Sequence, residues 1–169
     1  MNPELKNDIL GKMIPFLKEI GIHIIFRELE GECFLPGIQI IAGEMNIDRD
    51  RLLYPGDILH EAGHIAIVPS EERYTLDDRS IGERPMREAE EMMAIAWSYA
   101  VAVHLDIDPY LIFHDQGYKG GGSYIADNFS KGNYFGVSML QWKGFTCEKP
   151  DPQQPSRLLY PSMLKWMHE

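Results

Sequence analysis

The chain has 169 residues, with 26 acidic and 16 basic side chains and a formal net charge of −10. This length favours one core, so we expect residues 1–169 to form a single domain. The acidic balance, without a basic stripe, argues against nucleic acid and anionic membrane surfaces as partners. The longest apolar run, residues 92–103, is too short to span a bilayer. We therefore expect a cytoplasmic protein in which Cys33 and Cys147 are reduced thiols.

The first third of the chain predicts one helix followed by two strands. Apolar residues at helical spacing run from residue 3 to residue 20, where Gly21 ends the pattern. We expect Pro15 to kink or shorten this helix. Residues 22–27 and 37–42 are rich in β-branched side chains and predict strands.

Two further helices are predicted in the middle of the chain. A turn with a helix N-cap at residues 55–57 leads into a short helix over residues 58–68. Residues 70–84 carry many charges and predict a surface loop, although Ser80 and Glu83 have the spacing of a capping box. A second helix is expected from Pro85 to about residue 104 or 105, apolar on nearly every side after its first turn, and therefore buried.

The rest of the chain predicts short helices and loops. Glycines at residues 117–123 predict a flexible loop, and helices are expected over residues 123–129 and 134–143. The proline-rich residues 148–156 predict an extended tail. Helices and strands in this order predict an α+β domain with a small mixed sheet and a helical or irregular C-terminal part.

The sequence His60-Glu61-Ala62-Gly63-His64 is an HExxH motif. On a helix with 3.6 residues per turn, His64 lies about 40° and Glu61 about 100° from His60, so the polar side chains share one face. The opposite face is apolar and can anchor the helix to a core. Chance produces this motif in only about 2 % of chains of this composition, so we favour a zinc site over a solvated helix with two stray histidines. Gly63 would let another backbone or a substrate approach closely.

A catalytic zinc ion needs a third protein ligand and an open position for water. The next helix begins with the acidic residues Glu88, Glu90 and Glu91. We favour Glu91, because the small residues Ala94 and Ser98 lie on its face and would let the two helices pack closely. Glu88 and Glu90 remain the alternatives for the third ligand.

HEAGH followed by a glutamate on the next helix resembles gluzincin-type zinc metallopeptidases, specifically the ImmA/IrrE-like group, over residues 22–103. The second motif of that group, ExxANxFA, maps onto Glu91, Ala94, Ile95, Trp97 and Ser98, with Ile95 in place of the usual asparagine. The resemblance implies a minimal zincin-like domain in which His60, His64 and Glu91 bind Zn²⁺.

The resemblance further implies that Glu61 is the general base for a water molecule that zinc activates. The substrate would be a peptide or protein, in the narrowest case one regulatory protein, bound in extended form along residues 37–42. The alternative is a catalytically weak zincin-fold module that binds metal and a protein partner. The aromatic C-terminal half leaves room for a homodimer face.

An oxyanion formed during hydrolysis needs one more hydrogen-bond donor. Four residues in or near the glycine-rich loop could supply it, and the sequence does not rank them: His114, Tyr118, Tyr124 and Tyr134. Taken alone, His114 is expected to be an ordinary surface histidine.

Overall fold

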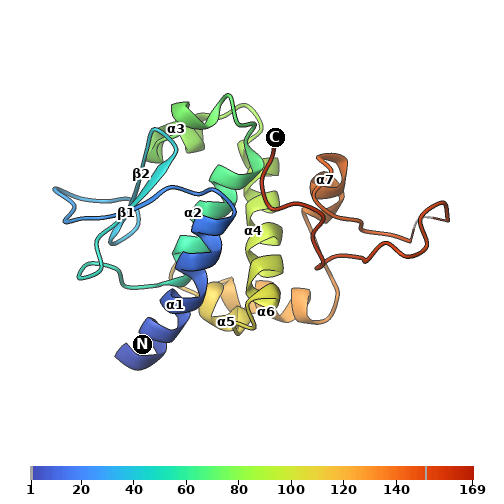
Figure 1. Ribbon diagram of the computed structural model, residues 1–169. Helices are drawn as coiled ribbons and strands as arrows, with labels where there is room; N and C mark the ends of the chain where they lie inside the picture. The colour runs from blue at the N-terminus through green and yellow to red at the C-terminus, as the bar shows by residue number, and fades with distance from the viewer. Residues whose placement is uncertain (1, 151) are drawn as a thin grey trace.

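Two helices packed against each other form the centre of the molecule, α2 (Gly56–Ile67) and α4 (Arg87–His104). The computed structural model describes residues 2–150 and 152–169. A small sheet lies on one side of the central pair and the last helix on the other, while two short helices that precede it in the chain lie at the lower end of the pair (Figure 1). The predicted α+β class with a small mixed sheet is therefore confirmed.

Helix α1 (Pro3–Glu19) begins where the sequence predicts it. The side chain of Asn2 caps its N-terminus by accepting a hydrogen bond from the Glu4 N–H. Pro15 lies inside the helix and does not shorten it, since the helix continues to Glu19. The apolar face of α1 is buried and joins the core.

The sheet has three strands, β1 (Ile24–Phe26), β2 (Ile38–Ile41) and β3 (Glu44–Ile47), in the order β1-β3-β2. Strand β3 pairs in parallel with β1 and antiparallel with β2. The first two strands are shorter than predicted, and β3 was not predicted at all. Its polar residues Glu44 and Asn46 conceal a short strand whose other residues are buried.

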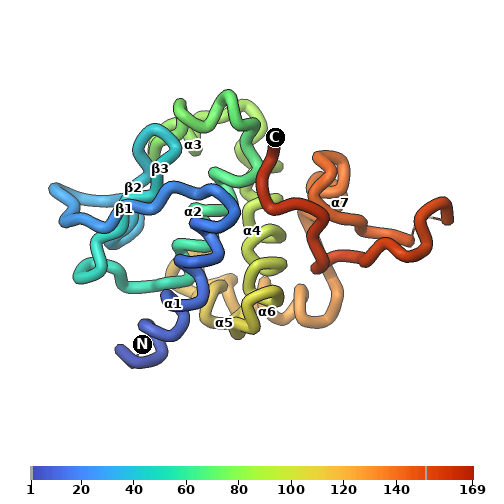
Figure 2. The backbone as a smooth tube through the Cα atoms, viewed as in Figure 1, coloured from blue at the N-terminus to red at the C-terminus, as the bar shows by residue number. Residues whose placement is uncertain are grey.

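Helix α2 begins two residues earlier than predicted, with Pro55 at its N-cap position. Asp57 is therefore inside the first turn and does not cap the helix with its side chain, contrary to expectation. At the other end, the Ala66 carbonyl accepts a hydrogen bond from the His168 N–H at 2.8 Å. The Ile67 carbonyl accepts one from Lys143 Nζ at 3.3 Å. Figure 2 shows the C-terminal segment returning to the two central helices.

The segment 70–84 is not the simple loop that its charges suggested. It contains a 3₁₀ turn, η1 (Arg73–Thr75), and a short helix, α3 (Asp78–Glu83). A capping box joins Asp77 and Ser80, each side chain accepting the other's backbone N–H. Helix α4 then begins at Arg87, two residues after Pro85.

The C-terminal part contains α5 (Pro109–Ile112), α6 (Gly122–Ser130) and α7 (Val137–Trp142). The sequence did not predict α5, and α7 is shorter than the predicted 134–143. The tail predicted over residues 148–156 includes residue 151, which lies outside the described residues. The cysteines are free, as expected. Within the described ranges, no helix is both long and apolar enough to cross a membrane.

Candidate metal centre

The two central helices approach each other at Gly63 of α2 and Ala94 of α4. A β-carbon on Gly63 would lie 3.0 Å from both the Cα and the carbonyl oxygen of Ala94. One turn further along α4, the Ser98 hydroxyl lies 3.0 Å from the Leu59 carbonyl oxygen of α2. The close approach expected for Gly63, and the small residues expected at the helix interface, are therefore both present.

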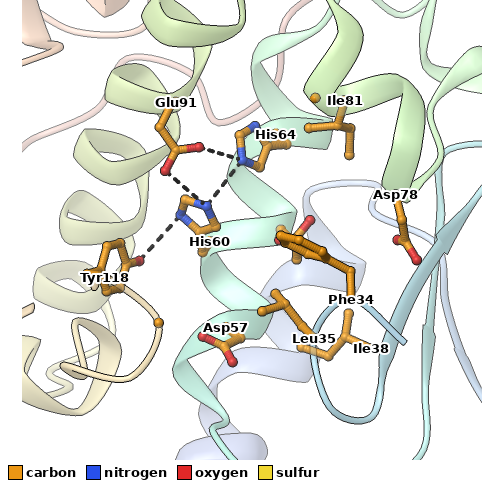
Figure 3. Close-up of a pocket in the computed structure, with 13 residues that line it drawn as sticks. Phe34, Leu35, Ile38, Asp57, His60, His64, Asp78, Ile81, Glu91 and Tyr118 are labelled. Atoms are coloured by element: carbon orange, nitrogen blue, oxygen red, sulfur yellow. Dashed lines mark hydrogen bonds and ion pairs between the residues drawn. The ribbon is translucent and has the colours of Figure 1, made fainter. Parts of the chain in front are cut away.

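This packing brings the side chains of His60, His64 and Glu91 together (Figure 3). The two Nε2 atoms of the histidines are 3.2 Å apart. The Glu91 carboxylate lies 3.5 Å from His60 Nε2 through Oε1 and 3.3 Å from His64 Nε2 through Oε2. Three potential ligand groups thus converge on one point from two helices.

The spacing of these atoms fits a tetrahedral zinc ion. Zinc binds histidine nitrogen at about 2.0–2.1 Å and carboxylate oxygen at about 2.0–2.2 Å. Two ligands at tetrahedral angles are then roughly 3.3–3.5 Å apart. The separations of 3.3 and 3.5 Å lie in this range and that of 3.2 Å lies just below it; the two distances from Glu91 end on different oxygens of its carboxylate. Two imidazoles and one carboxylate are also a donor set that catalytic zinc sites use.

The electrostatics of the three groups favour a cation between them. Burial raises the pKa of Glu91, but hydrogen bonds and charge from the two histidines outweigh it and hold that pKa far below its usual value. Burial lowers the pKa of His60, but the Glu91 hydrogen bond and the charges of Glu91, Glu61 and Asp57 raise it overall. A positive charge is therefore stabilised at the position where the ligand atoms meet.

Glu61 lies beside the histidines and lines the same cavity. Its side chain belongs to a group with His60 and His64 whose ligand atoms all lie within 4.8 Å of one another. Only 9 % of the residue is exposed, and burial raises its pKa, while the charges of the histidines lower it. Because Glu91 contacts both Nε2 atoms directly, Glu61 is free to act on a water molecule or a substrate.

The two alternative third ligands point elsewhere. Glu88 is exposed and pairs with Arg87 at 3.0 Å. Glu90 is buried, and its carboxylate accepts hydrogen bonds from Arg84 at 2.7 and 3.1 Å. Of the three glutamates, the structure brings Glu91 to the histidines and turns the other two toward arginines.

A cavity of about 320 Å³ opens beside the three ligand groups. One wall is the polar face of α2, and the facing wall is apolar (Figure 3). That apolar wall comes from the loop before β2, from β2 itself and from α3: Phe34, Leu35, Ile38 and Ile81. Phe34 is 83 % exposed. Ile38 lies in the segment 37–42 that was expected to bind the substrate, but sequence reasoning missed Phe34, Leu35 and Ile81, because they carry no motif and the α3 helix was not predicted.

The four candidates for an oxyanion donor have different surroundings. Tyr118 lines the cavity, with its hydroxyl 3.4 Å from His60 Nδ1. Tyr124 is 71 % exposed on α6, and Tyr134 packs among other aromatic rings of the core. His114 is not an ordinary surface residue, because its Nε2 lies 2.7 Å from the buried Asp57 carboxylate.

No protein-family model matches this chain, and no match was found among curated proteins or among solved structures.

Proposed function

We propose that the chain is a zinc-dependent peptidase of the gluzincin type, with a zincin-like domain related to the ImmA/IrrE-like group. The observation that carries this proposal is the cluster of His60, His64 and Glu91, whose nitrogen and oxygen atoms lie 3.2–3.5 Å apart, close to the ligand spacing of tetrahedral zinc. Two further features support it. Glu61 lies next to the cluster, and a cavity with one apolar wall opens beside it.

In this proposal His60, His64 and Glu91 hold the metal. Zinc bound there would supply Lewis-acid chemistry, lowering the pKa of water and polarising a carbonyl group. Glu61 accepts a proton as the water oxygen forms a bond to the peptide carbonyl carbon. It then delivers that proton to the amine nitrogen as the C–N bond breaks. Its raised pKa suits both steps, because a carboxylate that holds a proton more readily than usual can accept the proton and then pass it on.

The substrate in this proposal is an extended peptide or protein segment that lies along β2. Strand β2 is at the edge of the sheet, and Ile38 of this strand lines the cavity. The Ile40 N–H does not point to β3; it donates to Asp78 Oδ1 of α3 at 2.7 Å. A peptide that pairs with β2 would have to take this donor from Asp78. One apolar side chain of the peptide could then rest on the apolar wall.

The second candidate function is a catalytically weak module that binds zinc and a protein partner. The contact between Asp78 and Ile40 favours it, because the edge of β2 is already occupied. Such a module would hold zinc and bind its partner without hydrolysing peptides. The two functions therefore differ in turnover and not in metal content.

The first experiment is to measure the zinc content of protein purified without chelator. We expect close to one zinc ion per chain in the wild type and its loss in both His64→Ala and Glu91→Ala. Glu88→Ala is the matched control, because this glutamate begins the same helix but pairs with Arg87 at the surface. We expect it to keep its zinc.

Zinc retained by Glu91→Ala would show that the third ligand is another residue. A wild type that stays free of metal after zinc is added would contradict the peptidase and the binding module together.

A further inference from the structure

The loop between α5 and α6 is fastened to the start of α2 by His114. The imidazole ring of His114 stacks on Tyr54, with ring centres 3.9 Å apart and planes 13° from parallel. Its Nε2 lies 2.7 Å from Asp57 Oδ1, and the side chain is 11 % exposed. Asp57 is three residues before His60 on the same helix, so this fastening lies next to the candidate metal centre.

The hydrogen bonds of His114 fix which ring nitrogen carries the proton. The backbone N–H of Gly117 donates to Nδ1 at 3.1 Å, so Nδ1 must present a lone pair. The proton of the neutral ring is therefore on Nε2, where it is donated to Asp57. Gly117 permits this arrangement, because a β-carbon there would come within 2.9 Å of two ring atoms of His114.

The residue that follows Gly117 is placed against His60. The hydroxyl oxygen of Tyr118 lies 3.4 Å from His60 Nδ1, slightly longer than the roughly 2.7–3.2 Å of an ordinary N–H···O hydrogen bond. The two rings meet edge to face, with centres 5.7 Å apart and planes at 85°. Phe113 makes a further edge contact with the tyrosine ring, with ring centres 5.5 Å apart.

The two nitrogens of His60 thus face different partners. Nε2 faces His64 and Glu91, and Nδ1 faces Tyr118. An imidazole that offers the lone pair of Nε2 to a metal carries its proton on Nδ1. In metal sites this N–H usually donates to an oxygen outside the ligand set, which fixes the tautomer and the ring orientation.

We propose that Tyr118 is a positioning residue of the metal centre: its hydroxyl oxygen accepts the Nδ1–H of His60, and the His114–Asp57 pair holds it there. This proposal rests on the proposed zinc site. It extends that site to the loop after α5, in a part of the chain beyond the motif-bearing residues 22–103.

The test compares Tyr118→Phe with Tyr124→Phe, since Tyr124 is exposed on the neighbouring helix α6. Zinc affinity is measured by competition with a chromogenic chelator. We expect Tyr118→Phe to bind zinc roughly 10- to 100-fold more weakly, the usual cost of losing such a partner. Tyr124→Phe should bind like the wild type. With cobalt in place of zinc, Tyr118→Phe should also shift the visible absorption bands, a change that altered folding stability alone would not produce.

A second pair of variants tests the hydrogen bond between His114 and Asp57. Asp57→Asn keeps an oxygen that can accept the His114 Nε2–H, whereas Asp57→Ala does not. We expect Asp57→Ala to bind zinc more weakly than the wild type and Asp57→Asn to keep most of the wild-type affinity.

The outcomes separate this inference from the proposed function. Unchanged zinc affinity and an unchanged cobalt spectrum in Tyr118→Phe would overturn the positioning role while leaving the zinc site in place. A wild-type protein that binds no zinc would overturn both.

Discussion

Gly63 of the HExxH helix lies directly against the backbone of Ala94, three residues after Glu91 on the neighbouring helix. A β-carbon on Gly63 would lie 3.0 Å from the Ala94 carbonyl oxygen and 3.2 Å from its β-carbon. Glycine weakens a helix by about 1 kcal/mol relative to alanine, so its presence here is a cost to local stability. The close contact that it allows sets the separation of α2 and α4, and with it the reach of Glu91 to the two histidines.

We therefore expect Gly63→Ala to weaken zinc binding more than it weakens the fold. The added methyl group gains about 1 kcal/mol of helix propensity but meets backbone that cannot rotate away, at a typical cost of about 1–3 kcal/mol. The net loss of stability should therefore lie between zero and about 2 kcal/mol. Chemical denaturation measures the stability of the metal-free protein, and chelator competition measures the zinc affinity.

Gly11→Ala is the matched control for this change. Gly11 lies in helix α1, and a β-carbon added to it would have no other atom within 4 Å, so alanine should stabilise the protein by up to about 1 kcal/mol. Its zinc affinity should equal that of the wild type. A Gly63→Ala protein that behaves like Gly11→Ala would show that the helix separation does not depend on this glycine.

Glu61→Gln should strongly reduce hydrolysis and leave zinc in place. The amide has nearly the same shape as the carboxylate but cannot accept the proton, and loss of a general base typically lowers turnover by about 10²- to 10⁴-fold. Turnover of a quenched fluorescent peptide mixture, normalised to zinc content, measures the effect. Glu88→Gln serves as the control on an exposed glutamate. Full activity in zinc-loaded Glu61→Gln would exclude Glu61 as the base.

Asp78→Ala should lower the KM for extended peptides. The substitution frees the Ile40 N–H at the edge of β2, and a hydrogen bond that no longer has to be displaced is worth about 1 kcal/mol, or roughly fivefold in KM. Asp78→Asn is the matched control, because its amide oxygen can still accept from Ile40. Steady-state kinetics on the same peptide mixture would separate the variants. A higher KM in Asp78→Ala would instead make Asp78 part of the substrate site.

Asp48 should make the stability of the fold depend on pH in the acidic range. Its carboxylate accepts a hydrogen bond from the Leu29 N–H at 3.1 Å, and others from the N–H groups of Asp50 and Arg51. The Leu29 hydrogen bond is the main cause of its lowered pKa, which burial opposes and the other two hydrogen bonds and the Arg51 charge support. These contacts fix the loop after β1, which leads to the apolar wall of the cavity.

The direction of this pH dependence follows from the lowered pKa of Asp48. The carboxylate is ionised more readily in the folded chain than in the unfolded chain, where its pKa is about 3.9. Its contribution to stability is therefore fully present above that value and is lost as the pH falls through the folded pKa. Denaturation at a series of pH values measures the free energy of unfolding. This free energy should be lower for Asp48→Asn than for the wild type at neutral pH, and the difference should disappear in acid. Asp8→Asn, at an exposed position of α1, is the control; a difference that persists in acid would contradict the prediction.

The sequence predicted the parts of this structure that depend on neighbours along the chain. The HExxH residues share a face because helical periodicity is local, and the same periodicity singled out Glu91 with Ala94 and Ser98 beside it. Strand β3 was missed because its pattern of polar and apolar residues is short, and α3 because its charges suggested a loop. The cap of α3, Asp77 with Ser80, lies one turn before the box that the sequence suggested.

Contacts between distant residues could not be predicted in this way. His114 and Asp57 are 57 residues apart, and Tyr118 and His60 are 58 apart. Neither His114 nor Tyr118 lies in a motif. A single sequence does not show which loop packs against which helix. The apolar wall depends in the same way on the packing of α3 beside β2.

The hydrogen bonds at the C-terminal end of α2 bear on the order in which a growing chain can complete this site. The last carbonyl groups of a helix have no partners within it, and here Ala66 and Ile67 find theirs in His168 and Lys143. During translation both histidines of the motif leave the ribosome long before those partners are made. A nascent chain that has already formed α2 and α4 would therefore still lack the hydrogen bonds to the last carbonyl groups of α2, the helix that carries both histidines.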